Sequence, residues 1–325
     1  MPGYVAFYNN RGKFRRKSGG VLLLIKEELA QYVTVFESKD KKPKIDTRVK
    51  KHYCFISGDL CANVLFFKLS KKCVTRDILF GVVYIPPEGS PFENRDVFTE
   101  LENSLLLLEH DSVCFLGDFN ARTGAVDGII TDGFNNDFDM PYKVFDDAPG
   151  RDKIPNALPK RISQDMAINN HGFRLLDFCK TVDVAIVNGR VGSDANIGKC
   201  PCKNVSVVAY ALVSSDLFPL ISDFAVFDFC ELYSDVHCPI VLKLNLIEAQ
   251  ETELGHFESD DDDCLEDADE RNLQFITGKP VWCKTREDEY IFALDDAVIN
   301  QINIVLHEGL LSPRLRLWIL LIISF

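Results

Sequence analysis

Short apolar segments, each bounded by Gly, Pro, Asn or Asp, follow one another along the sequence as far as about residue 245. Segments of this length with such punctuation are typical of β-strands rather than of long helices. Two stretches, 96–109 and 170–180, instead space their apolar residues as amphipathic helices do. Many strands with a few helices between them predict an α/β fold, in which two sheets pack face to face with helices outside. The expected strands are 21–25, 32–36, 53–56, 64–69, 78–85, 113–116, 184–187, 205–213, 224–229 and 240–244.

The sequence divides into three parts. Residues 1–248 hold the strand-like segments and form the expected domain. Residues 249–270 contain eleven Asp or Glu and no Lys or Arg, which predicts a disordered acidic linker. Residues 271–325 are expected to be a helical tail, because the apolar residues between 287 and 309 have helical spacing. The apolar run that begins at residue 315 has about half of the ~20 residues needed to cross a bilayer, so no membrane span is expected.

Charge is unevenly distributed along the chain. Residues 1–76 carry 17 Lys or Arg against 6 Asp or Glu, although the whole chain has a formal net charge of −13. A basic stretch of this kind is the electrostatic footprint of a nucleic-acid binder, and a solvated basic loop explains it equally well from charge alone. The eleven cysteines are scattered through apolar segments, which indicates reduced thiols in an intracellular protein. The close pair Cys200 and Cys202 lacks a partner pair at zinc-finger spacing and is expected to lie in a turn.

One pair of polar residues follows the expected strand 113–116 directly. Asp118 and Asn120 project to the same side of an extended chain, and a carboxylate beside an amide can position a water, a metal ion or a phosphate oxygen. Taken alone, the pair is explained as well by turn formation, which Asp and Asn favour after a strand. The long polar stretch 121–168 that follows is expected at the rim of any site.

Two further groups have the same ambiguity. Asp235 and His237 precede an expected strand, and a carboxylate near an imidazole can act as a general acid–base unit. Tyr84 ends another strand, where its hydroxyl can donate to an anionic oxygen or simply cap the edge of the core.

The order of these motifs is more specific than any one of them. It runs Tyr-x-Pro, a helix, Gly-Asp-x-Asn, a long loop, Ser-x-x-x-Tyr on a strand, and Ser-Asp-x-His-x-Pro. This succession resembles the endonuclease/exonuclease/phosphatase superfamily and, more narrowly, the endonuclease domains of non-LTR retrotransposons. The resemblance covers roughly residues 3–245. The narrower match also rests on the segments 15–20, 159–165 and 187–190, and on Asn169 and Gly172.

The resemblance implies a two-sheet, four-layered α/β sandwich whose strand ends surround a divalent metal, Mg²⁺ or Mn²⁺, where water attacks a DNA phosphodiester. By the same resemblance, Asp118 orients or activates the water, Asn120 holds the transition state, and His237 stabilises the developing charge or passes a proton. Tyr84 would bind the phosphate, and Asp235 would lie on the metal side with Asp118. The implied partner is DNA, with no membrane and no obligate protein partner, and the location is nuclear if the protein acts on DNA.

Three departures from the family pattern predict that activity is impaired or lost. The family's first strands carry an Asn and the Glu that is the main metal ligand, and neither has a substitute in residues 1–10. The chain is therefore expected to lack those strands and to bind Mg²⁺ weakly. The Asp that orients the catalytic His is Ala209 here, and alanine accepts no hydrogen bond. The usual adjacent Asp-His is split by Val236.

Two other readings of the sequence remain open. One is an inactive transposon-derived remnant that at most binds nucleic acid through its basic N-terminal region. The other is the same fold acting on a small phosphorylated substrate such as an inositol or sphingolipid phosphate.

Overall fold

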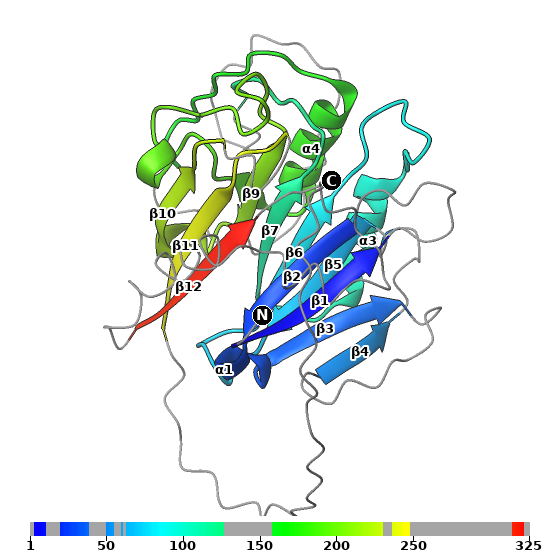
Figure 1. The fold of residues 1–325 in the computed structure, drawn as a ribbon, viewed down its shortest axis with the longest axis vertical. Helices are drawn as coiled ribbons and strands as arrows, with labels where there is room; N and C mark the ends of the chain where they lie inside the picture. Colours follow the sequence, from blue (N-terminus) through cyan, green and yellow to red (C-terminus); the bar gives the residue numbers. More distant parts are fainter. Residues whose placement is uncertain are drawn as a thin grey trace, which may run out of the picture.

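The computed structural model describes residues 3–10, 20–38, 50–54, 60, 63–126, 158–229, 236–247 and 314–321. These residues form one large sheet, two smaller sheets and two helices of more than two turns (Figure 1). The strands of the large sheet lie in the order β4-β3-β5-β6-β7-β9-β8. They are β3 (Val33–Ser38), β4 (Lys50–Cys54), β5 (Val64–Leu69), β6 (Ile78–Tyr84), β7 (Ser112–Asp118), β8 (Val184–Ile186) and β9 (Ala209–Ser214).

The middle of the large sheet is buried on both faces. β6 and β7 run parallel, and β9 lies antiparallel to β7 on its other side. Every residue of β7 is buried, which is the continuous pattern expected of a strand that is covered on both faces. The apolar run that precedes Asp118 in the sequence is therefore a central strand.

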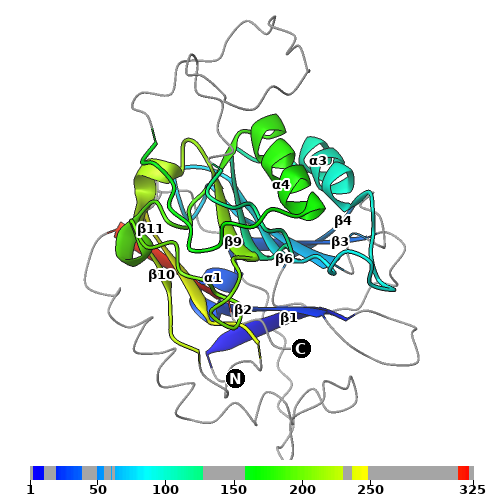
Figure 2. The same ribbon diagram turned by 90° about the horizontal axis from the view of Figure 1, so that it is seen from above.

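Two helices cover one face of the large sheet. α3 (Val97–Leu107) and α4 (Asn170–Thr181) lie on the same side of it (Figure 2). Phe178 of α4 packs edge-on to Phe115 of β7, with ring centroids 5.7 Å apart. The aromatic side chains thus anchor α4 over the strand that leads to Asp118.

Strands of two smaller sheets cover the other face (Figure 2). One is the antiparallel pair β1 (Tyr4–Asn10) and β2 (Gly20–Lys26), followed by the single-turn α1 (Glu27–Ala30). The other has the order β10-β11-β12, with β10 (Ile221–Val226), β11 (Ile240–Ile247) and β12 (Arg314–Leu321). Two 3₁₀ turns, η1 (Gly192–Asp194) and η2 (Phe218–Leu220), precede β10. These layers confirm the predicted α/β sandwich. Of the four expected layers, the described residues show three, namely the α3–α4 layer, the large sheet and the layer of the two smaller sheets.

The expected strands and the two expected helices are confirmed, with shifts at their ends. The expected strand 205–213 begins four residues later, at Ala209, and β1 was not expected at all. Residues 314–321 form a strand paired with β11, where a helical tail was expected. The expected linker, 249–270, and the rest of that tail lie outside the described residues. No helix among the described residues is long and apolar enough to span a membrane.

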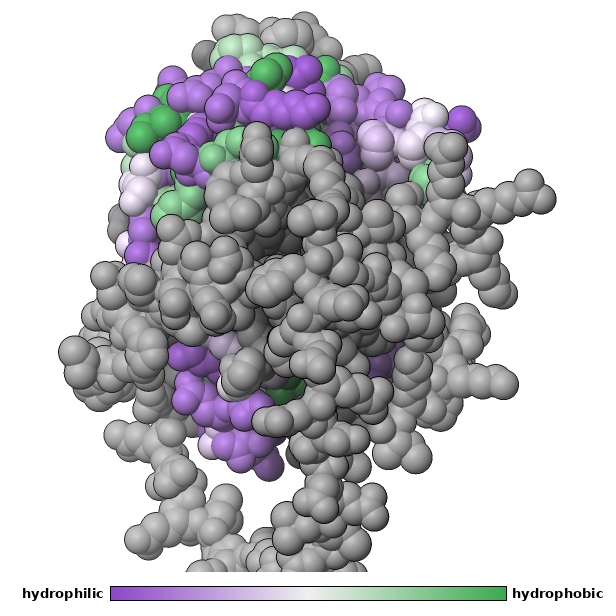
Figure 3. All heavy atoms as spheres, in the orientation of Figure 1, coloured by the Kyte–Doolittle hydropathy of each residue, from purple (hydrophilic) through white to green (hydrophobic). Residues whose placement is uncertain are grey.

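The described residues on the face seen in Figure 3 are mainly hydrophilic, with small hydrophobic areas between them. Exposed apolar side chains do occur in the loops near the end of β7, where Met166 is 72% and Ile168 38% exposed.

Candidate active site

The candidate site lies where β6 and β7 end. Because the two strands are parallel, their last residues meet at one edge of the sheet, and Tyr84 is paired in register with Asp118. On the other side of β7, β9 places Ala209 opposite Asp118. Gly117 allows this close packing, since a Cβ there would overlap the carbonyl group of Val83. The structure thus brings Tyr84 and Asp118 side by side.

Asp118 and Asn120 are joined by hydrogen bonds. The Asn120 backbone N–H donates to Asp118 Oδ1 at 2.8 Å, and Asn120 Nδ2 donates to Asp118 Oδ2 at 3.1 Å. Nδ2 also donates to the Ile85 carbonyl at 2.8 Å, which fixes the amide. Asn120 has a φ of 47°, in the left-handed region that Asn tolerates better than most residues. The pair therefore makes the turn that local chemistry predicts, and it also holds a carboxylate at the sheet edge.

His237 completes a three-residue cluster with this pair. Its Nε2 lies 3.4 Å from Asp118 Oδ2, and both side chains are almost fully buried. The imidazole comes from the segment just before β11, and an isolated antiparallel bridge pairs His237 with Cys202. The next residue, Cys238, donates its N–H to the Pro201 carbonyl at 2.7 Å. The segment around Cys202, expected only to turn, therefore also holds His237 in place.

Burial raises the pKa of Asp118. The residue is 1% exposed, and the loss of solvation raises the pKa of Asp118 to about 7, although the hydrogen bonds from Asn120 lower it. A carboxyl group with a pKa near neutrality can both accept and release a proton at physiological pH. The His237 imidazole nitrogen lies 3.4 Å from it.

Ala209 occupies the β9 position opposite Asp118, and its methyl group accepts no hydrogen bond. The carboxylate that lies at Nε2 of His237 is Asp118 itself. An Asp at position 209 would have its Cβ about 5 Å from that of Asp118, by the usual spacing of paired residues in antiparallel strands. The departure noted in the sequence thus lies within the cluster.

The other two predicted site residues have different outcomes. Tyr84 lies beside Asp118 by strand register and is half-buried against the core between the sheets. Its proposed contact with phosphate stays a prediction. Asp235 lies outside the described residues, so its role on the metal side also stays a prediction.

The described residues do not supply a Mg²⁺ or Mn²⁺ site. No group of three or more His, Cys, Asp or Glu side chains in the described ranges is arranged to hold a metal ion. Mg²⁺ requires several oxygen ligands in near-octahedral geometry, and Asp118 is the one carboxylate in the described cluster. Asp118 and His237 alone therefore do not fit this metal.

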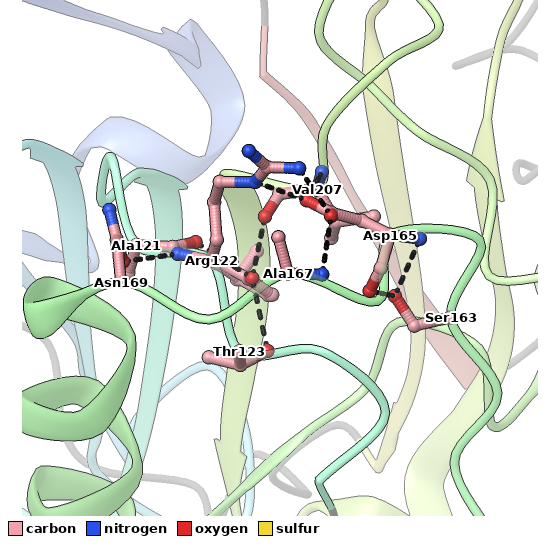
Figure 4. Close-up of polar contacts among 9 residues, drawn as sticks. Ala121, Arg122, Thr123, Ser163, Asp165, Ala167, Asn169 and Val207 are labelled. Atoms are coloured by element: carbon pink, nitrogen blue, oxygen red, sulfur yellow. Dashed lines mark hydrogen bonds and ion pairs between the residues drawn. The ribbon is translucent and has the colours of Figure 1, made fainter.

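A second buried carboxylate lies near the cluster, in the segment 159–165 that the sequence indicated only as part of the family resemblance and to which it assigned no role. Asp165 accepts two hydrogen bonds from Arg122, from Nε at 2.8 Å and from Nη2 at 2.6 Å (Figure 4). It also accepts the N–H groups of Ala167 and Val207, each at 3.0 Å. Burial opposes ionisation, but the bonds from Arg122 and the backbone outweigh it and hold the pKa of Asp165 below its usual value.

Asn169 ties this ion pair to the cluster. Its Oδ1 accepts the N–H of Arg122 and that of Gly172, each at 2.8 Å, and its Nδ2 donates to the Asn120 carbonyl at 3.0 Å. As the N-cap of α4, Asn169 also fixes the start of the helix against this loop. A Cβ at Gly172 would overlap the Arg122 carbonyl, which explains the glycine.

The Tyr210 hydroxyl contacts the same loop, which follows β7. Its hydroxyl lies 2.8 Å from the Ala121 carbonyl, 2.7 Å from the Val207 carbonyl and 3.1 Å from Thr123 Oγ1. The side chain is fully buried, so these contacts satisfy a polar group that solvent cannot reach. The tyrosine of the Ser-x-x-x-Tyr motif is thus a structural support of the site loop.

The fold and the cluster define an α/β sandwich protein with buried carboxylate, amide and imidazole groups at one edge of its large sheet. No family model matches the chain, and no curated protein matches it. Among solved structures it is similar to the endonuclease domain of TRAS1, a telomere-specific non-LTR retrotransposon, with 12% identity, 75% of this chain and 79% of that chain covered, and a TM-score of 0.43. It is also similar to the AP endonuclease LMAP from Leishmania major, with 13% identity, 74% and 69% covered, and a TM-score of 0.45.

Proposed function

We propose that the chain carries a phosphodiester hydrolase site of the retrotransposon-endonuclease kind, acting on DNA, with activity that is reduced or lost. The observation that carries the proposal is the meeting of Asp118, Asn120 and His237 at one sheet edge. These three residues come from two motifs of the ordered succession, with more than a hundred residues between Asn120 and His237.

The chemistry proposed for this cluster uses its own groups. Asp118, with a pKa near neutrality, would take a proton from the attacking water as the water oxygen bonds to phosphorus. The imidazolium of His237 would give a proton to the leaving sugar oxygen as the phosphorus–oxygen bond breaks, and would regain a proton from Asp118. Asn120 would hold the carboxylate in position through its two hydrogen bonds. A divalent metal, which Asp118 and His237 alone do not fit, would neutralise charge on the phosphate, and we propose Asp235 as the additional carboxylate ligand that it needs.

Cleavage of supercoiled plasmid and of an abasic-site duplex by the full chain, with Mg²⁺ or Mn²⁺, tests this proposal. We expect slow cleavage that is abolished in Asp118→Ala and in His237→Ala. Asp216→Asn serves as the matched control, because Asp216 follows β9 at the opposite end of the sheet and pairs with Arg76. Measurable cleavage at equal rates by the unaltered chain and by Asp118→Ala would overturn the hydrolase proposal.

Ala209→Asp tests the proposed cause of the reduced activity. If the missing carboxylate limits the rate, this variant should cleave at least about tenfold faster than the unaltered chain, because the new side chain would lie beside Asp118 and His237. Ala209→Asn has a similar size without the charge and serves as its control. A rate no higher than that of Ala209→Asn would show that the lost carboxylate is not the limiting defect.

The second candidate function is nucleic-acid binding without cleavage, through the basic residues of the N-terminal quarter. The observation that favours it is the excess of Lys and Arg in residues 1–76. Replacing Arg15 and Arg16 by Gln should weaken duplex DNA binding and flatten its dependence on salt. Binding that is absent or insensitive to salt in the unaltered chain would rule this function out.

A further inference from the structure

The Arg122 guanidinium uses one edge on Asp165 and leaves another edge open. The Arg122 side chain is 36% exposed, whereas that of Asp165 is 2% exposed. Nε and Nη2 donate to the carboxylate, and Nη1 has no hydrogen-bond partner in the part of the chain that the structure describes. A guanidinium has donors along more than one edge in fixed geometry, so it can hold a carboxylate and a second anion at once.

The loop that carries Arg122 is held rigidly beside the candidate active site. Arg122 lies two residues after Asn120, and Asn169 bonds to the backbone of both. The Asn169 N–H donates back to the Arg122 carbonyl at 3.1 Å, and the Gly124 N–H donates to the Ala167 carbonyl at 3.0 Å. These hydrogen bonds join the two segments 121–126 and 165–169 into one structural unit beside the candidate active site, which we call the site rim.

The exposed part of the site rim suits the backbone of a nucleic acid. The site rim also exposes the apolar side chains of Met166, Ile168 and, at 43%, Val126. Phosphate oxygens accept hydrogen bonds from arginine, and sugar rings offer apolar surface to side chains of this kind. The carboxylate of Asp165 holds the guanidinium in position, so that little conformational entropy is lost when an anion binds.

We propose that Arg122 is a phosphate-binding residue of the site rim, whose open edge donates to a non-bridging oxygen of a DNA phosphate next to the bond at the active site. This inference rests on the function proposed above and assigns to it the residue that fixes the DNA backbone. Asp165 is the positioning residue of this contact.

The paired variant Arg122→Gln with Asp165→Asn tests the proposal. It removes the open edge together with the buried charge, so that no unpaired carboxylate remains in the interior. The matched control is Arg76→Gln with Asp216→Asn, which removes an ion pair with a similarly exposed arginine at the far end of the sheet. Binding of the full chain to a fluorescein-labelled duplex is measured by anisotropy between about 50 and 200 mM salt, with thermal unfolding as a check on folding.

We expect the Arg122 pair variant to bind about tenfold more weakly, with a salt slope smaller by up to about 1, while the Arg76 pair variant binds as the unaltered chain does. Equal binding by the Arg122 pair variant would assign Arg122 a purely structural role and overturn the proposal. If that variant fails to fold, Arg122→Lys decides the matter. Lys keeps the charge but lacks the second edge, so we expect a loss of at least about threefold, and unchanged binding overturns the proposal.

Failure of the proposed function is distinguishable from failure of this inference. If the unaltered chain shows no salt-dependent binding to the duplex, the proposed function itself fails. If the unaltered chain binds and the Arg122 variants bind equally well, the inference alone fails.

Discussion

Two buried aspartates of this protein have pKa values that are shifted in opposite directions. Asp118 and Asp165 are each at most 3% exposed, and burial penalises the charged form of both. Asp165 receives a guanidinium fork and two backbone N–H groups, and its pKa is lowered. Asp118 receives the donors of one asparagine, and its pKa is raised to about 7. The partners of a buried carboxylate therefore decide whether it is a fixed ion or a proton-exchanging group.

The largest effect is expected from Asp165→Ala, which tests the fixed ion. The variant leaves the N–H groups of Ala167 and Val207 without their acceptor and removes the counterion of Arg122. We expect the free energy of unfolding to fall by about 2–4 kcal/mol, measured by urea denaturation at pH 7. A loss below about 1 kcal/mol would show that Asp165 does not organise the site rim.

Asp118→Asn tests the proton-exchanging group through pH. The pKa of Asp118 in the folded chain lies above its ordinary value of 3.8, so the folded state binds a proton more tightly than the unfolded state between about pH 4 and pH 7. The stability of the unaltered chain should therefore fall as pH rises through this window, by about 2–4 kcal/mol. Asn has no proton to lose, so this part of the pH dependence should be absent in the variant.

Urea unfolding of both proteins at several pH values, in the presence of a chelator, gives the measurement. Asp165→Asn provides the contrast. Because the pKa of Asp165 is lowered, its contribution is present above the ordinary pKa and is lost as pH falls. The same pH profile for Asp118→Asn and the unaltered chain would contradict the raised pKa.

Asn169→Ala should lower the free energy of unfolding by a smaller amount. It should also disturb both aspartates, because Asn169 bonds to the backbone of Arg122, the partner of Asp165, and of Asn120, the partner of Asp118. The variant removes the acceptor for the Arg122 and Gly172 N–H groups and the donor to the Asn120 carbonyl. The loss of an N-cap of this kind costs about 1–2 kcal/mol of unfolding free energy. Asn169→Asp keeps the acceptor and should recover part of the loss. If DNA cleavage and binding are unchanged in Asn169→Ala, the two groups are not coupled through this residue.

Arg76→Gln should have the smallest effect. Arg76 pairs with Asp216 at a position where both side chains are more than a third exposed, so solvent screens the interaction. We expect a change below about 1 kcal/mol in unfolding free energy, by the same urea assay. A loss as large as that in Asp165→Ala would mean that an exposed pair and a buried pair are equivalent here, which would remove the basis of the comparison.

The sequence predicted the local parts of this structure well. Period and punctuation located β7 and α4, and the turn chemistry of Asp118 and Asn120 follows from adjacent residues. His237 was assigned through the order of motifs and a family resemblance, and the structure places it 3.4 Å from Asp118.

Non-local pairings could not be predicted in the same way. Arg122 and Asp165 are 43 residues apart, and nothing in either segment indicates the other. Residues 314–321 were assigned to a helical tail because periodicity alone does not distinguish a short apolar strand from a helix. Their strand structure depends on pairing with β11, which is distant in the sequence. Such pairings depend on the sheet order, which becomes known only from the tertiary structure.

The pairing of β12 with β11 joins two segments that are separated along the chain by residues 248–313. While that connection is intact, the strand Arg314–Leu321 is present at a high effective concentration whatever the dilution of the protein. Proteolytic cleavage anywhere in the connection would turn the intramolecular pairing into a bimolecular one. The two fragments would then separate on dilution. The average molecular mass measured in solution would therefore depend on concentration for the cleaved protein, unlike for the intact chain.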